Sequence, residues 1–299
     1  MERIRTELLD IAYEAGGPVD GPVLLLVHGW PDAVRGWRHV APRLHAAGYR
    51  TLAPYLRGSG PTRFLSAETF RDGRAVALAQ DVIDFANALG LQRFAVVGHD
   101  WGARVAYTLA ALFPERVTSI AALALAFQPR AEFKLPSFSQ SRLFWYQWFM
   151  CLDSGAEAVR ADPKGFARIQ WDTWSPPGWF DDSEFEETAK SFANPDWADI
   201  TLNAYRWRWR PEPFDRRYDA LQERLGSVET LGTPTLMIQG GADSCDEPAD
   251  SEGQEKYFTG PYQRLVLEGV GHFPAREAPG KVADAVLAHL GSSQRLTGP

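Results

Sequence analysis

Short apolar runs alternate with segments of helical spacing along most of the chain. The runs 23–27, 94–97, 120–127 and 235–238 are largely apolar, as strands buried on both faces of a parallel sheet are. Helical spacing at 68–89 and 104–113 separates them, and a further strand at 264–267 precedes a helix at 278–290. The segment 4–15 resembles an antiparallel edge hairpin. This order of strand, helix and strand predicts an α/β fold around a mostly parallel sheet.

A second pattern begins after residue 127. Eight of the eleven tryptophans lie between Trp145 and Trp209, where segments of helical spacing are broken by prolines until the strand at 235. We therefore predict a helical cap at 128–228, inserted into a core domain formed by 1–127 and 229–299. Most of the tryptophans in the cap should pack its interior, and the others should line a pocket.

The amino-acid composition limits the kinds of binding partner and the location that we expect for the protein. The net charge is −7 and charges of both signs are interspersed, so no basic face offers itself to nucleic acid or anionic lipid. The only cysteines, Cys151 and Cys245, cannot form a disulfide framework and lack metal-ligand spacing. Residues 1–17 lack the pattern of a signal peptide, and no apolar run is long enough to span a bilayer. We expect a cytoplasmic protein without metal or cofactor, and the sequence leaves a homodimer open.

The first candidate catalytic motif directly follows the strand at 94–97. Gly98-His99-Asp100-Trp101-Gly102 lies between this strand and the next helix, which is the arrangement of a nucleophile elbow with aspartate in place of the usual serine. Glycines on both sides allow a strained turn and a close approach of strand and helix. The helix N-terminus stabilises negative charge. The pentapeptide alone does not separate a nucleophilic Asp100 from one that only caps the helix.

Two later strands end in loops that carry an acid and a base. Gly240-Gly241-Ala242-Asp243 follows the strand at 235–239, and the loop after the strand at 264–267 contains His272 between glycine-rich residues. The chain order nucleophile, acid and histidine is the order of a hydrolase triad. For the acid, Asp243 fits best, and Asp246 and Glu132 are the alternatives.

The strand at 23–27 ends in His28-Gly29-Trp30-Pro31. With this loop and the Asp100 elbow, nearly the whole chain resembles the α/β-hydrolase superfamily. Within it, the chain is most similar to the branch with an aspartate nucleophile, which comprises epoxide hydrolases and the haloalkane and haloacetate dehalogenases. The resemblance implies an eight-stranded sheet, a peptide before Pro31 that is often cis, and an oxyanion hole made by the amide N–H groups of Trp30 and Trp101.

An aspartate nucleophile favours displacement at a saturated carbon, because an ionised carboxylate has no proton to lose. The product is an alkyl ester of Asp100, which water activated by His272 then hydrolyses. A halide leaves as an anion and requires N–H donors, whereas an epoxide oxygen requires a proton. The side chains of the cap therefore decide between the two leaving groups.

Epoxide hydrolases carry two cap tyrosines that supply this proton, the first in a Tyr-Gln segment and the second in a Tyr-Arg segment. Tyr146-Gln147 and Tyr205-Arg206 match these segments. The resemblance thus implies Tyr146 and Tyr205 as acids, and we expect Gln147 and the adjacent Trp148 to contact substrate. We predict an epoxide hydrolase that converts a small apolar or aromatic epoxide and water to a vicinal diol.

Two alternatives remain open at this point. Trp101 follows the nucleophile, as the halide-binding tryptophan of haloalkane dehalogenases does, and Arg104 lies where haloacetate dehalogenases hold a substrate carboxylate. Arg104 could equally be an ion-pair partner on the helix surface. The second alternative is a catalytically silent hydrolase fold that only binds, which predicts a broken triad.

Overall fold

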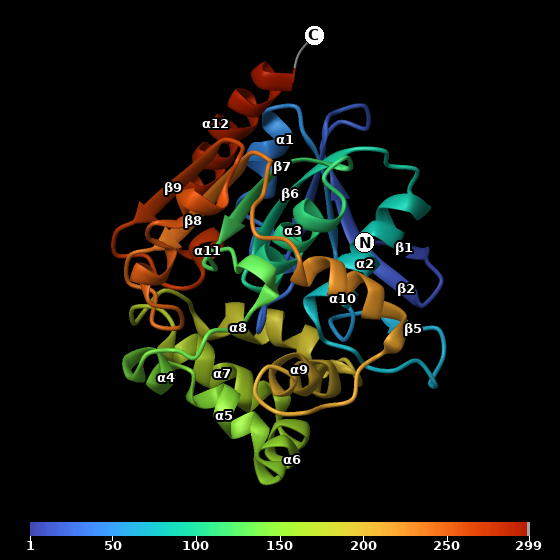
Figure 1. Ribbon diagram of the computed structural model, residues 1–299, viewed down its shortest axis with the longest axis vertical. Coiled ribbons are helices and arrows are strands. Elements are labelled where there is room, and N and C mark those ends of the chain that lie inside the picture. The colour runs from blue at the N-terminus through green and yellow to red at the C-terminus, as the bar shows by residue number, and fades with distance from the viewer. Residues whose placement is uncertain (298–299) are drawn as a thin grey trace.

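The computed structural model describes residues 1–297, with side chains up to residue 293. Within this range the chain forms a nine-stranded sheet that helices cover on both faces (Figure 1). The strands are β1 (Glu2–Arg5), β2 (Leu9–Gly16), β3 (Val23–Val27), β4 (Arg50–Pro54), β5 (Arg63–Phe64), β6 (Phe94–His99), β7 (Val117–Leu123), β8 (Thr235–Gly240) and β9 (Tyr262–Leu267).

The strand order is β1-β2-β4-β3-β6-β7-β8-β9, with β5 paired to β2 beside this path. All neighbours from β4 to β9 are parallel, and β1 and β2 form the antiparallel edge expected at 4–15. The predicted mostly parallel sheet of eight strands is confirmed, and the two-residue strand β5 adds a ninth. Strands β6 and β8 are buried at every residue, in agreement with their continuous apolar sequences.

One strand and one helix differ in their boundaries from the prediction. Strand β7 covers 117–123 instead of 120–127, because Ala124 has a φ of 72° that ends the extended conformation. The helix predicted at 68–89 begins only at Ala75, because the carboxylate of Asp72 accepts a hydrogen bond from the amide of Arg74 and holds the preceding residues in a loop.

Helices α1 (Ala41–Ala46) and α12 (Pro279–Thr297) pack on one face of the sheet, and α2 (Ala75–Ala88) and α3 (Trp101–Leu112) pack on the other. The short helix α11 (Pro274–Glu277) precedes α12. None of the helices in residues 1–297 combines the length and the hydropathy that a bilayer crossing needs. The 3-10 helices are η1 (Val34–Trp37), η2 (Pro129–Ala131), η3 (Lys190–Ala193), η4 (Arg216–Tyr218), η5 (Pro248–Ser251) and η6 (Gln254–Tyr257).

Between β7 and β8 the described chain is helical, and we keep the name cap for this segment. Its α-helices are α4 (Phe138–Leu143), α5 (Trp145–Cys151), α6 (Asp153–Ala161), α7 (Pro163–Thr173), α8 (Asp182–Ala189), α9 (Trp197–Arg206) and α10 (Asp219–Gly226). Figure 1 shows α4 to α9 gathered beyond one end of the sheet, whereas α10 packs against α3 of the core. Helices α7 and α8 begin where Asp162 and Asp181 accept hydrogen bonds from amides of the first turn.

One apolar cluster joins the cap to the sheet. Trp171 and Phe185 of the cap belong to the same buried cluster as Leu25 and Val96 of the central strands. A second cluster lies between the sheet and the α1 and α12 layer. The cap therefore shares its core with the α/β domain, which fixes its position over the end of the sheet.

Candidate active site

The turn between β6 and α3 is strained. Asp100 has φ 51° and ψ −112°, a conformation that costs a non-glycine residue about 1–3 kcal/mol. A Cβ on Gly98 would lie 2.1 Å from the carbonyl oxygen of Gly102, and a Cβ on Gly102 would lie 2.0 Å from that of Val27. Both flanking glycines are therefore required, and together they lift the Asp100 side chain out of the turn.

The carboxylate of Asp100 is buried and held from two sides. Its Oδ1 accepts a hydrogen bond of 2.7 Å from the amide of Trp30, and its Oδ2 lies 3.6 Å from Nε2 of His272. Burial raises the pKa of Asp100, but His272 and the Trp30 amide outweigh it and lower that pKa below its ordinary value. Trp101 is the first residue of α3, so its amide N–H has no acceptor within the helix. The Trp30–Pro31 peptide is cis.

His272 lies between two carboxylates. Its Nδ1 is 2.9 Å from Oδ2 of Asp243, whose Oδ1 accepts hydrogen bonds from the amides of Cys245 and Asp246. Burial lowers the pKa of His272, yet the charges of Asp243 and Asp100 outweigh it and raise that pKa well above its ordinary value. Of the two nearby acids, the structure brings Asp243 to the imidazole.

Three residues hold His272 in place, a role that the sequence did not predict for any of them. His99 donates through Nε2 to the carbonyl of His272 at 2.7 Å, and Ser175 accepts from the amide of His272 at 2.9 Å. The ring of Trp174 meets the imidazole edge-on, with 4.8 Å between the ring centroids. The only signal available was the position of His99 beside the nucleophile, because no sequence spacing relates the cap residues to His272.

The two cap tyrosines lie side by side under the cap. The ring centroids of Tyr146 and Tyr205 are 5.4 Å apart, and each residue is 2% exposed. The hydroxyl of Tyr205 accepts from Nε1 of Trp101 at 3.1 Å, and that of Tyr146 accepts from Nε2 of Gln147 at 3.0 Å. Burial raises the pKa of both phenols well above 10, so both stay neutral and can donate a proton.

Trp30 forms the centre of this aromatic cluster. Its ring stacks on Trp101 and Tyr146, with centroid distances of 6.2 and 5.8 Å, and meets Tyr205 edge-on at 5.1 Å. Its own indole N–H donates to Thr201 of α9 at 2.9 Å. The residue that supplies an amide to Asp100 therefore also joins the elbow to both tyrosines.

The two residues predicted to contact substrate, Gln147 and Trp148, lie in different surroundings. Gln147 is buried and bonded to Tyr146. Trp148 instead packs on Trp209, with 4.6 Å between centroids, and donates its indole N–H to the carbonyl of Ser141. The structure thus brings Gln147 to the site and places Trp148 within the packing of the cap.

A cavity of about 420 Å³ lies between the cap and the core next to these tyrosines. Its lining includes Gln147, Arg104, Arg208, Asp246 and Glu132. Tyr146 and Tyr205 do not line it but contact residues that do, because Gln147 is bonded to Tyr146 and the Arg208 guanidinium lies 4.6 Å from the ring centroid of Tyr205.

Arg104 belongs to the lining of this cavity and does not extend over the helix surface. Its Nη1 donates to the Gln128 side chain at 2.5 Å, and its guanidinium lies over the ring of Phe133 at 5.3 Å. No carboxylate of residues 1–293 forms an ion pair with it within 4 Å. The expected surface ion pair is therefore not present in this structure.

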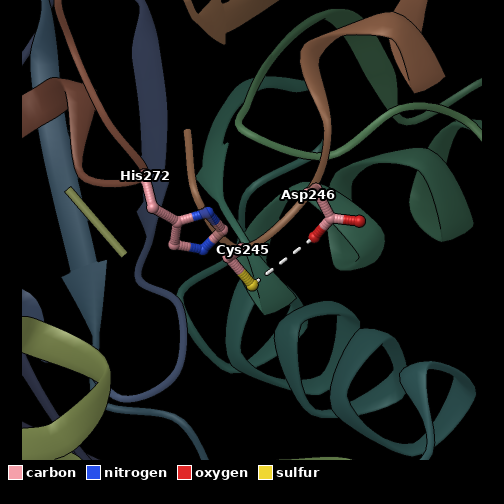
Figure 2. A group of neighbouring side chains, drawn as sticks. All are labelled: Cys245, Asp246 and His272. Carbon is pink, nitrogen blue, oxygen red and sulfur yellow. Dashed lines mark hydrogen bonds between the residues drawn. The ribbon is translucent and has the colours of Figure 1, made fainter. Parts of the chain in front are cut away.

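Cys245, Asp246 and His272 lie close enough for their ligand atoms to fall within 4.8 Å of one another (Figure 2). A metal would need the thiolate and a free imidazole nitrogen. Burial, and then the charges of Asp246 and Asp243, raise the pKa of the Cys245 thiol well above its usual range. Because burial keeps the thiol protonated and Nε2 of His272 is directed at Asp100, 3.6 Å away, we assign the imidazole to the triad and not to a metal site.

Comparisons with known proteins identify the family of the chain. Residues 22–279 match the family model of the alpha/beta hydrolase fold. The chain belongs to the α/β-hydrolase fold family. This α/β hydrolase is 29% identical to epoxide hydrolase A of Mycobacterium tuberculosis, over 93% of the chain and 92% of that protein. It superposes on a crystal structure of a candidate epoxide hydrolase from Klebsiella pneumoniae with a TM-score of 0.90 and 36% identity, and 96% of each chain is covered.

A dehalogenase also resembles part of this α/β hydrolase. A fluoroacetate dehalogenase from Burkholderia is 29% identical over 65% of both chains. The matches to the mycobacterial epoxide hydrolase A and to the Klebsiella structure each cover more than nine-tenths of the chain. The resemblance to epoxide hydrolases that the sequence predicted is therefore confirmed.

Proposed function

We propose that this α/β hydrolase is an epoxide hydrolase that opens its substrate through an alkyl ester of Asp100. The observation that carries the proposal is the pair of buried, neutral phenols packed against Trp30 and Trp101, the residues that flank the nucleophile. An epoxide oxygen needs a proton or a hydrogen bond as the ring opens, and a neutral phenol can supply both.

In the first half-reaction, ionised Asp100 attacks an epoxide carbon. Its lowered pKa keeps the carboxylate charged at neutral pH, and no base is needed because a carboxylate carries no proton to remove. The new C–O bond displaces the ring oxygen, which Tyr146 and Tyr205 stabilise. The aromatic rings around both tyrosines favour a small apolar or aromatic epoxide.

In the second half-reaction, His272 activates water against the ester carbonyl. Esterification removes the charge of Asp100, one of the two charges that raise the pKa of His272, so the imidazole can then act as a base. Asp243 holds the ring through Nδ1. The amides of Trp30 and Trp101 would bind the oxyanion, and one such donor is worth about 3 kcal/mol.

The indole N–H groups argue against a dehalogenase. A departing halide needs free N–H donors, yet Trp101 donates to Tyr205, Trp30 donates to Thr201 and Trp148 donates to Ser141. A silent binding fold is disfavoured because the triad is not broken: His272 lies 3.6 Å from Asp100 and 2.9 Å from Asp243. The two free thiols suit a reducing compartment, so we keep the cytoplasm as the proposed location.

Product analysis tests the proposal. Purified protein is incubated separately with styrene oxide, 1-bromobutane and fluoroacetate, and diol and free halide are assayed. We expect diol from styrene oxide and no halide from the other two. Halide release without diol would replace the epoxide assignment with a dehalogenase.

A further inference from the structure

Tyr146 has neighbours that Tyr205 lacks. The hydroxyl of Tyr205 is bonded to the indole of Trp101, which donates a hydrogen bond but cannot give up its proton at neutral pH. The hydroxyl of Tyr146 lies 3.6 Å from Sγ of Cys245, and this sulfur lies 3.7 Å from Oδ2 of Asp246. Both distances suit hydrogen bonds of sulfur, so hydrogen bonds connect a phenol, a thiol and a carboxyl group in series.

This series of hydrogen bonds connects the buried hydroxyl of Tyr146 to the cavity. Tyr146 and Cys245 are 2% and 1% exposed, whereas Asp246 is partly exposed and lines the 420 Å³ cavity. Figure 2 shows the Asp246 carboxyl group reaching the sulfur of Cys245 from the adjacent position in the loop after β8. Of these three hydrogen-bonded residues, Asp246 is therefore the one that can take up protons from the cavity.

We propose that Asp246 and Cys245 relay a proton from the cavity to Tyr146, which makes Tyr146 the phenol that protonates the epoxide oxygen. Tyr205 then orients the oxygen by a hydrogen bond. This inference rests on the proposed epoxide hydrolase function. It adds to that function the route by which a fully buried acid is supplied with a proton as the epoxide opens.

The proton transfers balance. As Asp100 forms the new C–O bond and the epoxide C–O bond breaks, the ring oxygen takes the proton of Tyr146. In the same step Tyr146 takes the thiol proton of Cys245, Cys245 takes the carboxyl proton of Asp246, and water in the cavity reprotonates Asp246, so no phenolate is left buried beside the new ester. His272 releases one proton before it accepts another from the hydrolytic water, so the whole cycle adds one water to the epoxide.

The charges around Asp246 allow it to start this relay near neutral pH. Burial, and then the charge of Asp243, raise the pKa of Asp246 to about 7. The other charged groups that face it or share the cavity are Asp100, Arg104, Glu132, Lys134, Arg208, Glu247, Asp250 and His272. Asp246 is thus protonated below pH 7 and loses its proton as the pH rises through that value. The phenols, with pKa values well above 10, cannot cause a change in this range.

The test measures the rate at which Asp100 is alkylated by styrene oxide in a single turnover, from pH 5.5 to 9. For the wild-type protein we expect the rate to fall about tenfold per pH unit above about 7. Asp246→Asn should lose this pH dependence and be slower by at least about tenfold below pH 7. Cys245→Ala should also lose the pH dependence and be slower below pH 7, because Asp246 still titrates but is no longer connected to Tyr146.

Controls separate a relay from an electrostatic or structural effect. Glu247→Gln changes a neighbouring acid of the same cavity and should keep the wild-type profile. Cys245→Val fills the same space and replaces the alanine variant if that variant does not fold. Persistence of the fall above pH 7 in a folded Cys245 variant would overturn the relay while leaving the epoxide hydrolase function intact. A wild-type protein that forms neither ester nor diol would overturn both.

Discussion

Nδ1 of His272 lies 2.9 Å from Oδ2 of Asp243, and neither side chain has any exposed surface. The two amide hydrogen bonds to the other oxygen of Asp243 fix the carboxylate, so the imidazole has one orientation with Nε2 toward Asp100. This contact serves only the second half-reaction in the proposed mechanism, because the first needs no base.

Asp243→Asn should therefore slow hydrolysis of the ester more than its formation. We expect the hydrolysis rate to fall by about 10² or more, because the amide cannot stabilise the imidazolium that forms. Rapid-quench mass spectrometry of the Asp100 peptide would follow both steps. Equal losses in both steps would show that Asp243 acts on the nucleophile instead.

Removal of the phenol hydroxyls should affect the first step. Tyr146→Phe and Tyr205→Phe should each slow alkylation by about tenfold or more, and the double variant should be nearly inactive with epoxides. The rate of ester formation with styrene oxide measures this. A double variant that forms the ester at the wild-type rate would remove both phenols from the mechanism.

Acid should slow hydrolysis of the ester without slowing its formation. The lowered pKa of Asp100 keeps it ionised until the pH falls through that low value, so alkylation should continue at pH 5.5. Hydrolysis requires neutral His272, and its raised pKa keeps the imidazole protonated as the pH falls. We expect the ester to accumulate in the steady state at pH 5.5 and to be scarce at pH 8, as measured by intact-protein mass spectrometry. Equal amounts at both values would contradict this assignment.

A buried charge network ties the cap to the core. Arg276 of the core bonds to Asp32 and to Glu184 of the cap, and its guanidinium lies over Trp171 at 4.8 Å. Arg276→Gln leaves two buried carboxylates without this partner, so we expect a loss of about 3 kcal/mol in the free energy of unfolding. Denaturant titration measures it.

The matched control is the exposed pair of Arg43 and Asp284. Arg43→Gln should change the free energy of unfolding by less than about 1 kcal/mol. Equal effects of the two substitutions would mean that the buried network does not stabilise the attachment of the cap.

The sheet and the elbow could be predicted because their signals are local. The apolar runs of β3, β6 and β8 and the glycines around Asp100 lie within a few residues of one another, so their geometry follows from short-range sterics. The end of β7 could not be predicted, because Ala124 turns the chain within an unbroken apolar sequence.

The sequence favours Asp243 over Asp246 as the acid, but the directions of the two carboxylates could not be predicted from it. The two acids are three residues apart in one loop, and the path of that loop turns Asp243 toward His272 and Asp246 toward the cavity. The contacts of His99 and Ser175 with His272 join segments that are far apart in the chain. Such contacts exist only once the cap has packed on the sheet.

The covalent ester on Asp100 is the central claim, and trapping it is the most direct test. His272→Gln is exposed once to styrene oxide, and the protein is digested and examined by mass spectrometry. We predict that the peptide containing Asp100 gains the mass of one styrene oxide, and that Asp100→Ala, treated identically, gains none. A folded His272→Gln variant whose Asp100 peptide stays unmodified would contradict the two-step mechanism.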